Sequence, residues 1–448
     1  MDLAAVSLAA LVVALAVSCV SQVNIGVLAI VLAWMVGVYV GGMRPEQVLA
    51  GFPVSLFLTL VGVTLLFSQA QGNGTLERLA QRAVHLCRGN RGLIPMMFFA
   101  VTAALSSSGP GNIAATALMA PLGMAAAGRF QIPPLLMAIM IANGASAGSV
   151  SPVAPTGIIV NQLAAKIGLP DVRWTIYANN FTAHAVIAFA GYFLLGGWKL
   201  MGAPRRIVSP HPAAAGTGVW ADEPIVPRTV EASADLAAEP DPLSAPSEQL
   251  TPHHWLTIAV IAALIVGAVV FNVNVGIAAF AGALILALSG AANEASAFRT
   301  MPWNVIVMVS GVTVLVALLE KTGGMELFTE FIGRLATPAT VIPVTAFVTG
   351  LVSIYSSTTG VVLPAMLPIV PGVIQHIGGG SPMAVVSAMV VGGHLVDVSP
   401  LSTLGALCLA SAPAGTDTRR LFNQLLAWGV SMTFIAAAVC WVFFGLIE

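Results

Sequence analysis

The chain has 448 residues, of which 58% are apolar and only 8% are Asp, Glu, Lys or Arg. A soluble domain is about 25% charged, so this composition excludes an ordinary water-soluble protein. The net charge of −1 gives no indication of a nucleic-acid partner, and we expect none.

Eight apolar segments that carry almost no charge are predicted to be membrane-spanning helices. A span needs roughly 17–25 residues, and in lipid the backbone must satisfy its own hydrogen bonds, which favours helices. The first segment follows no basic stretch, so we expect it to be retained and not cleaved as a signal. The segments are 3–20, 24–41, 53–70, 174–200, 255–272, 274–290, 303–319 and 421–447.

Residues 203–252 divide the chain into two transmembrane halves, 1–202 and 253–448. This segment is rich in Pro, Ala and acidic residues, so we expect a disordered linker outside the bilayer. Short motifs recur in the two halves at offsets of 250, 249 and 248 residues, which indicates an internal duplication. The pairs are Val23-Asn24-Ile25-Gly26 with Val273-Asn274-Val275-Gly276, Gly62-Val63-Thr64 with Gly311-Val312-Thr313, and Val150-Ser151-Pro152 with Val398-Ser399-Pro400.

Each half also contains one segment that is predicted to be a re-entrant hairpin. In residues 93–127, two apolar arms of about a dozen residues flank a tip at 106–112, and such arms are too short for a bilayer core of roughly 30 Å. The Gly-Pro-Gly sequence in this tip breaks a helix. The counterpart is 341–373, with its tip at 353–360.

A discontinuous helix follows each hairpin. Residues 135–166 are interrupted at 149–157, and residues 383–412 are interrupted at 397–403. We therefore predict an all-α polytopic membrane protein with two repeats. Each repeat has about five transmembrane helices, of which one is discontinuous, plus a re-entrant hairpin. Because five crossings is an odd number, the second repeat is expected to be inverted.

The basic residues predict the orientation. Segment 75–91 is basic and amphipathic, as expected of an interfacial helix. With the N-terminus outside, one side receives five basic residues, Arg44, Lys166, Arg173, Lys321 and Arg334, and the other receives the remaining twelve of the 17, including those of the linker. The positive-inside rule makes the second side cytoplasmic. We expect both termini to be periplasmic, the linker to be cytoplasmic, and the protein to lie in a bacterial inner membrane.

The four interruptions are the candidate binding regions. Helices that begin inside the bilayer present unpaired N–H groups and a positive dipole end, which attract anions. Ser and Thr also enrich plain helix contacts, but four paired clusters beside Pro favour a binding role. The candidate substrate-binding residues are Ser108, Gly109, Gly111, Asn112, Pro155, Thr156, Ser357, Thr358, Thr359, Ser402 and Thr403. Tyr355 and, more weakly, Asn143 are further candidates.

A cation is expected in the same regions, because hydroxyl, amide and backbone oxygens can replace the hydration shell of Na⁺. His394 and Asp397 are the ionisable pair there, and such groups within spans are usually functional. Asp397 could instead cap the following half-helix. The candidate Na⁺ or H⁺ residues are Ser106, Ser107, Asn112, Gly148, Ser149, Ser151, Ser353, Ser356, Thr359, His394 and Asp397.

At these residues the chain resembles the ion transporter superfamily, most closely the dicarboxylate carriers of the MatC type and more distantly the divalent anion:sodium symporters. The symporters carry Ser-Asn-Thr at each tip and a Pro about ten residues later. Here Gly111-Asn112-Ile113 precedes Pro121, and Thr358-Thr359-Gly360 precedes Pro368. The family's Thr-Pro in each broken helix is similar to Ser151-Pro152 and Ser399-Pro400.

The resemblance implies a symporter that imports a small dicarboxylate together with Na⁺, and malonate is the first candidate substrate. It implies no covalent cofactor, an elevator mechanism and a homodimer in the lipid bilayer. One alternative is an H⁺-coupled carrier of another organic or inorganic anion, such as citrate. An alternative of another class is an intramembrane enzyme that uses His394 and Asp397, although no third catalytic partner or metal motif accompanies that pair. We expect a transporter and not an enzyme.

Overall fold

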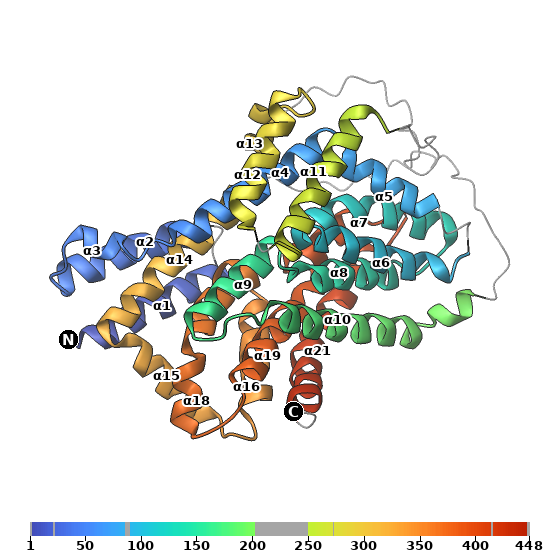
Figure 1. The fold of residues 1–448 in the computed structure, drawn as a ribbon. Coiled ribbons are helices and arrows are strands. Elements are labelled where there is room, and N and C mark those ends of the chain that lie inside the picture. The colour runs from blue at the N-terminus through green and yellow to red at the C-terminus, as the bar shows by residue number, and fades with distance from the viewer. Residues whose placement is uncertain are drawn as a thin grey trace, which may run out of the picture.

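The computed structural model describes residues 2–20, 23–85, 90–201, 250–271, 273–413 and 415–445. In these ranges the chain is helical and contains no strand (Figure 1). The all-α fold predicted from the composition is therefore confirmed. Residues 203–249 of the predicted linker lie outside the described residues.

The helices of the two halves follow the same order. The first half contains α1 (Leu3–Val20), α2 (Ile25–Trp34), η1 (Met35–Val40), α3 (Pro45–Leu49), α4 (Val54–Gly72), α5 (Thr75–His85), α6 (Leu93–Ser107), α7 (Gly111–Phe130), α8 (Pro134–Ser149), α9 (Pro155–Lys166), α10 (Arg173–Leu194) and η2 (Gly197–Leu200). The second half contains α11 (Pro252–Val269), α12 (Val275–Leu288), α13 (Glu294–Thr300), α14 (Trp303–Thr322), α15 (Gly324–Leu335), α16 (Val341–Ser353), η3 (Thr358–Val362), α17 (Leu363–Met366), η4 (Leu367–Ile369), α18 (Val370–Ile377), α19 (Pro382–Leu395), η5 (Val396–Val398), α20 (Thr403–Ala410), α21 (Thr418–Cys440) and η6 (Trp441–Gly445). The inversion of one half relative to the other across a membrane stays a prediction.

All eight predicted spanning segments coincide with helices. Among the described residues, six helical runs are long and apolar enough to cross a membrane. These runs are Val54–Gly72, Gly111–Phe130, Trp303–Thr322, Thr358–Ile377, Pro382–Ala410 and Thr418–Gly445. The short helices α3 and α13, which precede α4 and α14, are additions that the apolar pattern did not predict.

The repeated glycine motifs lie where helices of different halves cross. Helix α2 packs against α14, and α12 packs against α4 (Figure 1). A Cβ atom at Gly311 would overlap the backbone of Gly26, and one at Gly62 would lie 2.7 Å from the carbonyl oxygen of Gly276. Small residues let helix backbones approach each other closely. The motifs therefore recur because each half supplies one glycine to each crossing.

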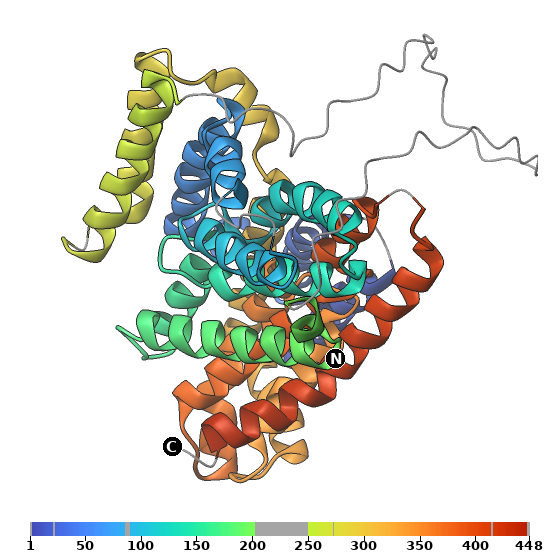
Figure 2. The same ribbon diagram turned by 90° about the vertical axis from the view of Figure 1, so that its right-hand side faces the viewer.

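A second group of helices, the hairpin group, contains the two hairpins (α6–α7 and α16–α18) and the two broken helices (α8–α9 and α19–α20). Helix α8 packs against α6, α7 and α10, and α19 packs in the equivalent way against α16 and α21. Both α8 and α19 are buried along almost their whole length. Figure 2 shows α11 at an outer edge of the molecule, away from this group. The glycine-crossed helices and the hairpin group are thus two distinct parts of one fold.

The hairpins differ from the sequence expectation in the length of their second arms. Helix α7 has 20 residues and continues through Pro121, and the helical run Thr358–Ile377 is equally long. The estimate of about a dozen residues was therefore wrong for these arms, because the helices begin inside the predicted tips, at Gly111 and Thr358, and continue to Phe130 and Ile377. The turns themselves lie at the predicted tips, between α6 and α7 and between α16 and η3.

Candidate functional site

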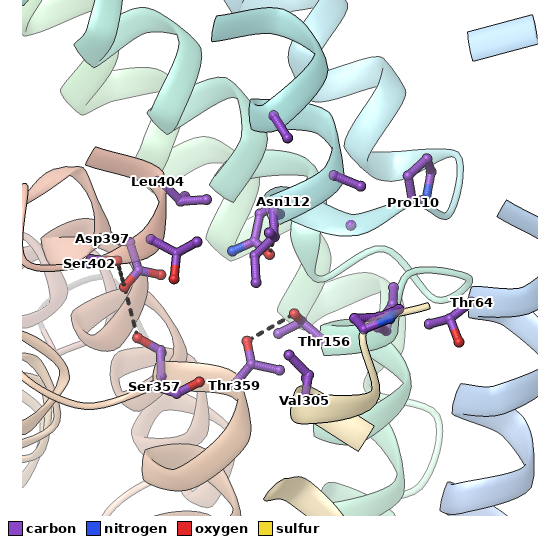
Figure 3. Close-up of a pocket in the computed structure, with 18 of the residues that line it drawn as sticks. Thr64, Pro110, Asn112, Thr156, Val305, Ser357, Thr359, Asp397, Ser402 and Leu404 are labelled. Carbon is purple, nitrogen blue, oxygen red and sulfur yellow. Dashed lines mark hydrogen bonds between the residues drawn. The ribbon is translucent and has the colours of Figure 1, made fainter. Parts of the chain in front are cut away.

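A cavity of about 400 Å³ lies where the two hairpin tips and the two helix breaks meet. Its walls come from both halves of the chain (Figure 3). The glycine-crossed group also contributes, through α4 and the start of α14. The cavity therefore lies between the two structural groups of the fold.

Four helices begin at this cavity. Gly111, Pro155, Thr358 and Thr403 are the first residues of α7, α9, η3 and α20, and all four line the cavity. The first N–H groups of a helix have no partner within that helix, and the helix dipole places partial positive charge there. This arrangement is suited to an anion, because it supplies donors and positive potential without a basic side chain.

The local sequence explains why these helices begin where they do. Pro155 occupies the first turn of α9, where a missing N–H costs nothing. The side chain of Ser357 accepts a hydrogen bond of 3.1 Å from the N–H of Gly360, which caps the run that begins with η3. At the first tip, Gly109 and Gly111 have φ values of 134° and 79°, which side chains with a Cβ rarely adopt.

Asp397 is the one residue with a formal charge among the described residues that line the cavity. Its Oδ1 accepts hydrogen bonds from the hydroxyls of Thr358, at 3.0 Å, and Ser402, at 3.3 Å. These partners come from the second hairpin and the second helix break, so the carboxylate joins the two. These contacts do not support the alternative that Asp397 caps α20, because the carboxylate accepts from side-chain hydroxyls and Ser402 occupies the N-cap position of that helix.

A second contact joins the two halves directly. The hydroxyls of Thr156 in α9 and Thr359 in η3 lie 3.0 Å apart (Figure 3). Asn112 projects toward the same space from the start of α7. The chain therefore brings together an amide, several hydroxyls and one carboxylate from segments that are more than 200 residues apart in sequence.

Ten of the eleven candidate substrate-binding residues line the cavity, and Ser108 does not. The hydroxyl of Ser108 donates to the carbonyl of Leu105 in the preceding turn, at 2.7 Å. Tyr355 lines the cavity, whereas the amide of Asn143 bonds to Ile139 and His184 inside the hairpin group. Substrate binding by these residues stays a prediction.

The candidate cation residues are only partly brought together. Asn112, Ser356, Thr359 and Asp397 line the cavity. The other seven, Ser106, Ser107, Gly148, Ser149, Ser151, Ser353 and His394, are not among the residues described around it. In the first half the hydroxyls bond to other parts of the protein: Ser106 to the carbonyl of Ala145 at 2.7 Å, and Ser107 to the hydroxyl of Tyr177 at 2.8 Å.

Asp397 lines the cavity, whereas His394 is not among the residues described around it. His394 is buried, and its Nδ1 lies 2.8 Å from the carbonyl of Val390 within its own helix. Its Nε2 has no hydrogen-bond partner among the described residues. Within the described ranges no group of three His, Cys, Asp or Glu side chains could hold a metal ion.

Sequence reasoning missed one wall of the cavity. Thr64, Phe67, Ser68 and Gln71 contribute from α4. Thr300, Pro302 and Val305 contribute from the end of α13, the N-cap of α14 and α14 itself. Thr64 belongs to a motif that the repeat had singled out, so the repeat was a signal that could have identified α4. The other residues carry no local signal, because only the packing of α4 and α14 against the tips places them here.

The comparison with known families agrees with this geometry. Residues 1–149 match the model described as the dicarboxylate carrier protein MatC N-terminus. The chain resembles the MatC dicarboxylate carriers over this stretch. This MatC resemblance confirms the family likeness predicted from the tips and the broken helices. No curated protein matches the chain significantly.

Two solved transporters share the fold. MtrF of Neisseria gonorrhoeae, reported as one of a class of antimetabolite efflux pumps, is 15% identical with a TM-score of 0.58, over 92% of this chain and 85% of its own. The YdaH transporter of Alcanivorax borkumensis is 17% identical with a TM-score of 0.57, over 89% of this chain and 88% of its own. The chain thus has the fold of a multi-pass membrane transporter. The proteins it resembles are transporters and not enzymes, in agreement with the expectation from the sequence.

Proposed function

We propose that this protein is a secondary active transporter. It imports a small dicarboxylate by symport with Na⁺, and malonate is the first candidate substrate. The observation that carries the proposal is the cavity at which α7, α9, η3 and α20 all begin. Four helix N-termini and the hydroxyls of both halves supply donors on more than one side. A ligand with an anionic group at each end would use them together.

The position of the cavity supports an elevator mechanism. It lies between the hairpin group and the group in which α2 crosses α14 and α4 crosses α12 at glycines. In the proposed mechanism the glycine-crossed group is the scaffold, which also forms a homodimer, and the re-entrant hairpins carry the substrate past it. We place the protein in a bacterial inner membrane, with periplasmic termini and a cytoplasmic linker.

Uptake by purified protein in proteoliposomes tests the proposed function. Labelled malonate, succinate and citrate are offered under an imposed Na⁺ gradient, an imposed pH gradient, or neither. We expect malonate to accumulate fastest, and only with inward Na⁺. Citrate accumulation driven by the pH gradient would favour the H⁺-coupled alternative, and counterflow without any chemical product would exclude an enzyme.

The orientation has its own test. Single cysteines near Lys166 and Lys321 should react with a membrane-impermeant maleimide added to intact cells, whereas a cysteine near Arg228 should not. Labelling near Arg228 from outside would reverse the proposed topology.

A further inference from the structure

The buried and the exposed residues that line the cavity differ in their chemistry. Asn112, Thr156 and Thr358 stand at the starts of α7, α9 and η3, and all three line the cavity and are buried. Amide and hydroxyl groups beside helix N-termini suit the carboxylates of a ligand, because they add donors to those of the backbone. The groups that recognise an anion therefore lie in the buried part of the site.

Most of the exposed lining from the tips and the breaks is apolar. Four lining residues of these segments are exposed, and all but Thr403 are large and mainly apolar. Ile113 at the first tip is 40% exposed, Tyr355 at the second tip is 55% exposed, and Leu401 at the second break is 46% exposed. Apolar surface that lines a ligand cavity and remains exposed is available to an apolar part of the ligand.

The exposure of Leu401 is not a consequence of packing that the two halves repeat. Val153 stands 248 residues earlier, at the equivalent place in the first break. It is only 3% exposed and is not among the residues described around the cavity. The second break thus presents an apolar side chain to the cavity, whereas the first break buries its counterpart within the protein.

The cavity is also larger than an unsubstituted malonate requires. Malonate displaces about four water molecules, on the order of 120 Å³ at roughly 30 Å³ for each water. The cavity measures about 400 Å³. Malonate alone would leave more than half of this space to water, which would lie against the exposed apolar side chains.

We propose that the preferred substrate is a malonate that carries an apolar substituent, such as a short alkyl group, on its central carbon. This inference rests on the proposed transport function for the malonate unit. The two carboxylates bind at the buried polar groups, and the substituent lies against Ile113, Tyr355 and Leu401. Each methylene that is removed from water there tightens binding by up to about fourfold.

A graded series of ligands tests the preference in purified full-length protein, held in lipid nanodiscs with saturating Na⁺. Malonate, methylmalonate, ethylmalonate and n-butylmalonate are titrated by calorimetry, with hydroxymalonate as the polar counterpart of methylmalonate and empty nanodiscs as the control for partition into lipid. We expect affinity to rise along the series, on the order of 100-fold from malonate to n-butylmalonate, and hydroxymalonate to bind more weakly than methylmalonate. The heat-capacity change should be more negative for n-butylmalonate, because more apolar surface is buried.

A pair of variants tests where the substituent lies. Leu401→Ala should lower the ratio of n-butylmalonate affinity to malonate affinity roughly three- to tenfold, because part of the apolar contact is lost. Leu351→Ala is the control and should leave this ratio unchanged, since Leu351 is 48% exposed but is not among the described lining residues. If Leu401→Ala does not fold, Ile113→Ala gives the same test.

The possible outcomes separate this inference from the proposed function. Affinity that falls as the substituent grows would overturn the inference and leave malonate transport standing. Binding of n-butylmalonate without detectable binding of malonate would support the substituent preference and refute malonate as the substrate. If no member of the series binds, both proposals fail. An unchanged ratio in Leu401→Ala would overturn the position assigned to the substituent.

Discussion

The helices of the two halves follow the same order along the chain, but the side chains at equivalent positions differ in their chemistry. Gly144 in α8 and Gly392 in α19 are 248 residues apart, and a Cβ at either would overlap a carbonyl oxygen of the adjacent hairpin helix, that of Phe99 or Ala346. Five residues further along the chain, the first half has Ser149 at the end of α8 and the second has Asp397 in η5. The close contact between helices is thus repeated in both halves, whereas the side chains near the helix breaks differ between the halves.

The largest effect should come from the packing that the halves have in common. Gly311→Leu and Gly276→Leu each place a side chain against the backbone of the opposite half. Overpacking costs about 1–3 kcal/mol when the neighbours are side chains that can move, and backbone cannot move as easily. We expect almost no monodisperse protein on size-exclusion chromatography from either variant. Gly72→Ala is the control, because nothing lies within 4 Å of its added Cβ. Normal folding of one variant alone would show that the two crossings are unequal.

A charge transplant tests the chemical difference. In the double variant Asp397→Asn, Ser149→Asp the carboxylate moves to the buried position in the first half, outside the described cavity wall. We expect Na⁺-driven uptake to fall roughly 100-fold and not to recover, because the cavity loses the attraction between Asp397 and Na⁺, which is about 3 kcal/mol for opposite charges about 5 Å apart at an effective dielectric constant of 20. Uptake in proteoliposomes at matched protein content measures this. Recovery of Na⁺ dependence would mean that the halves are interchangeable.

The two tips are expected to contribute similar energies to binding. Asn112 and Thr359 lie in equivalent places, and each offers a polar side chain to the cavity. Loss of a hydrogen bond to a charged group costs about 1.5–3 kcal/mol, so Asn112→Ala and Thr359→Ala should each weaken malonate affinity roughly ten- to hundredfold. Equilibrium binding in detergent checks this, with thermal unfolding to show that the variants fold. An effect at one tip only would place the whole ligand in one half.

The smallest effect should come from the contact between the halves. Thr156→Val keeps the shape of the side chain but removes the hydroxyl that lies 3.0 Å from that of Thr359. A neutral hydrogen bond contributes about 0.5–1.5 kcal/mol, so we expect the malonate affinity to weaken roughly two- to tenfold. Thr156→Ser should restore it. Equal affinities for the Val and Ser variants would show that this contact does not position either tip.

The sequence predicted well those features that depend on a local signal. All eight predicted apolar segments coincide with helices, and Ser151-Pro152 and Ser399-Pro400 marked both helix breaks, because these signals act over a few residues. The arm length was underestimated, because the sequence does not show that α7 begins inside the predicted tip, at Gly111, and continues to Phe130.

The candidate site was predictable only in part. The tips and breaks could be named because the repeat paired them, and the structure brings most of them to one cavity. Phe67 and Gln71 could not be named, because their position follows from the crossing of α4 with the other half. The sequence also could not show that the hydroxyl of Ser106 donates to the carbonyl of Ala145, or that the hydroxyl of Ser107 shares a hydrogen bond with Tyr177.

The glycine crossings also bear on how the protein is made. Helices α2 and α4 pack against α14 and α12, and the ribosome synthesises these partners more than 200 residues later. We therefore expect the first half to enter the bilayer before the partners of its glycine faces exist. During that interval we expect it to be open to attack by membrane proteases. Two separately expressed halves should accordingly protect each other from degradation when they are produced in the same cell, and each should be short-lived when it is produced alone.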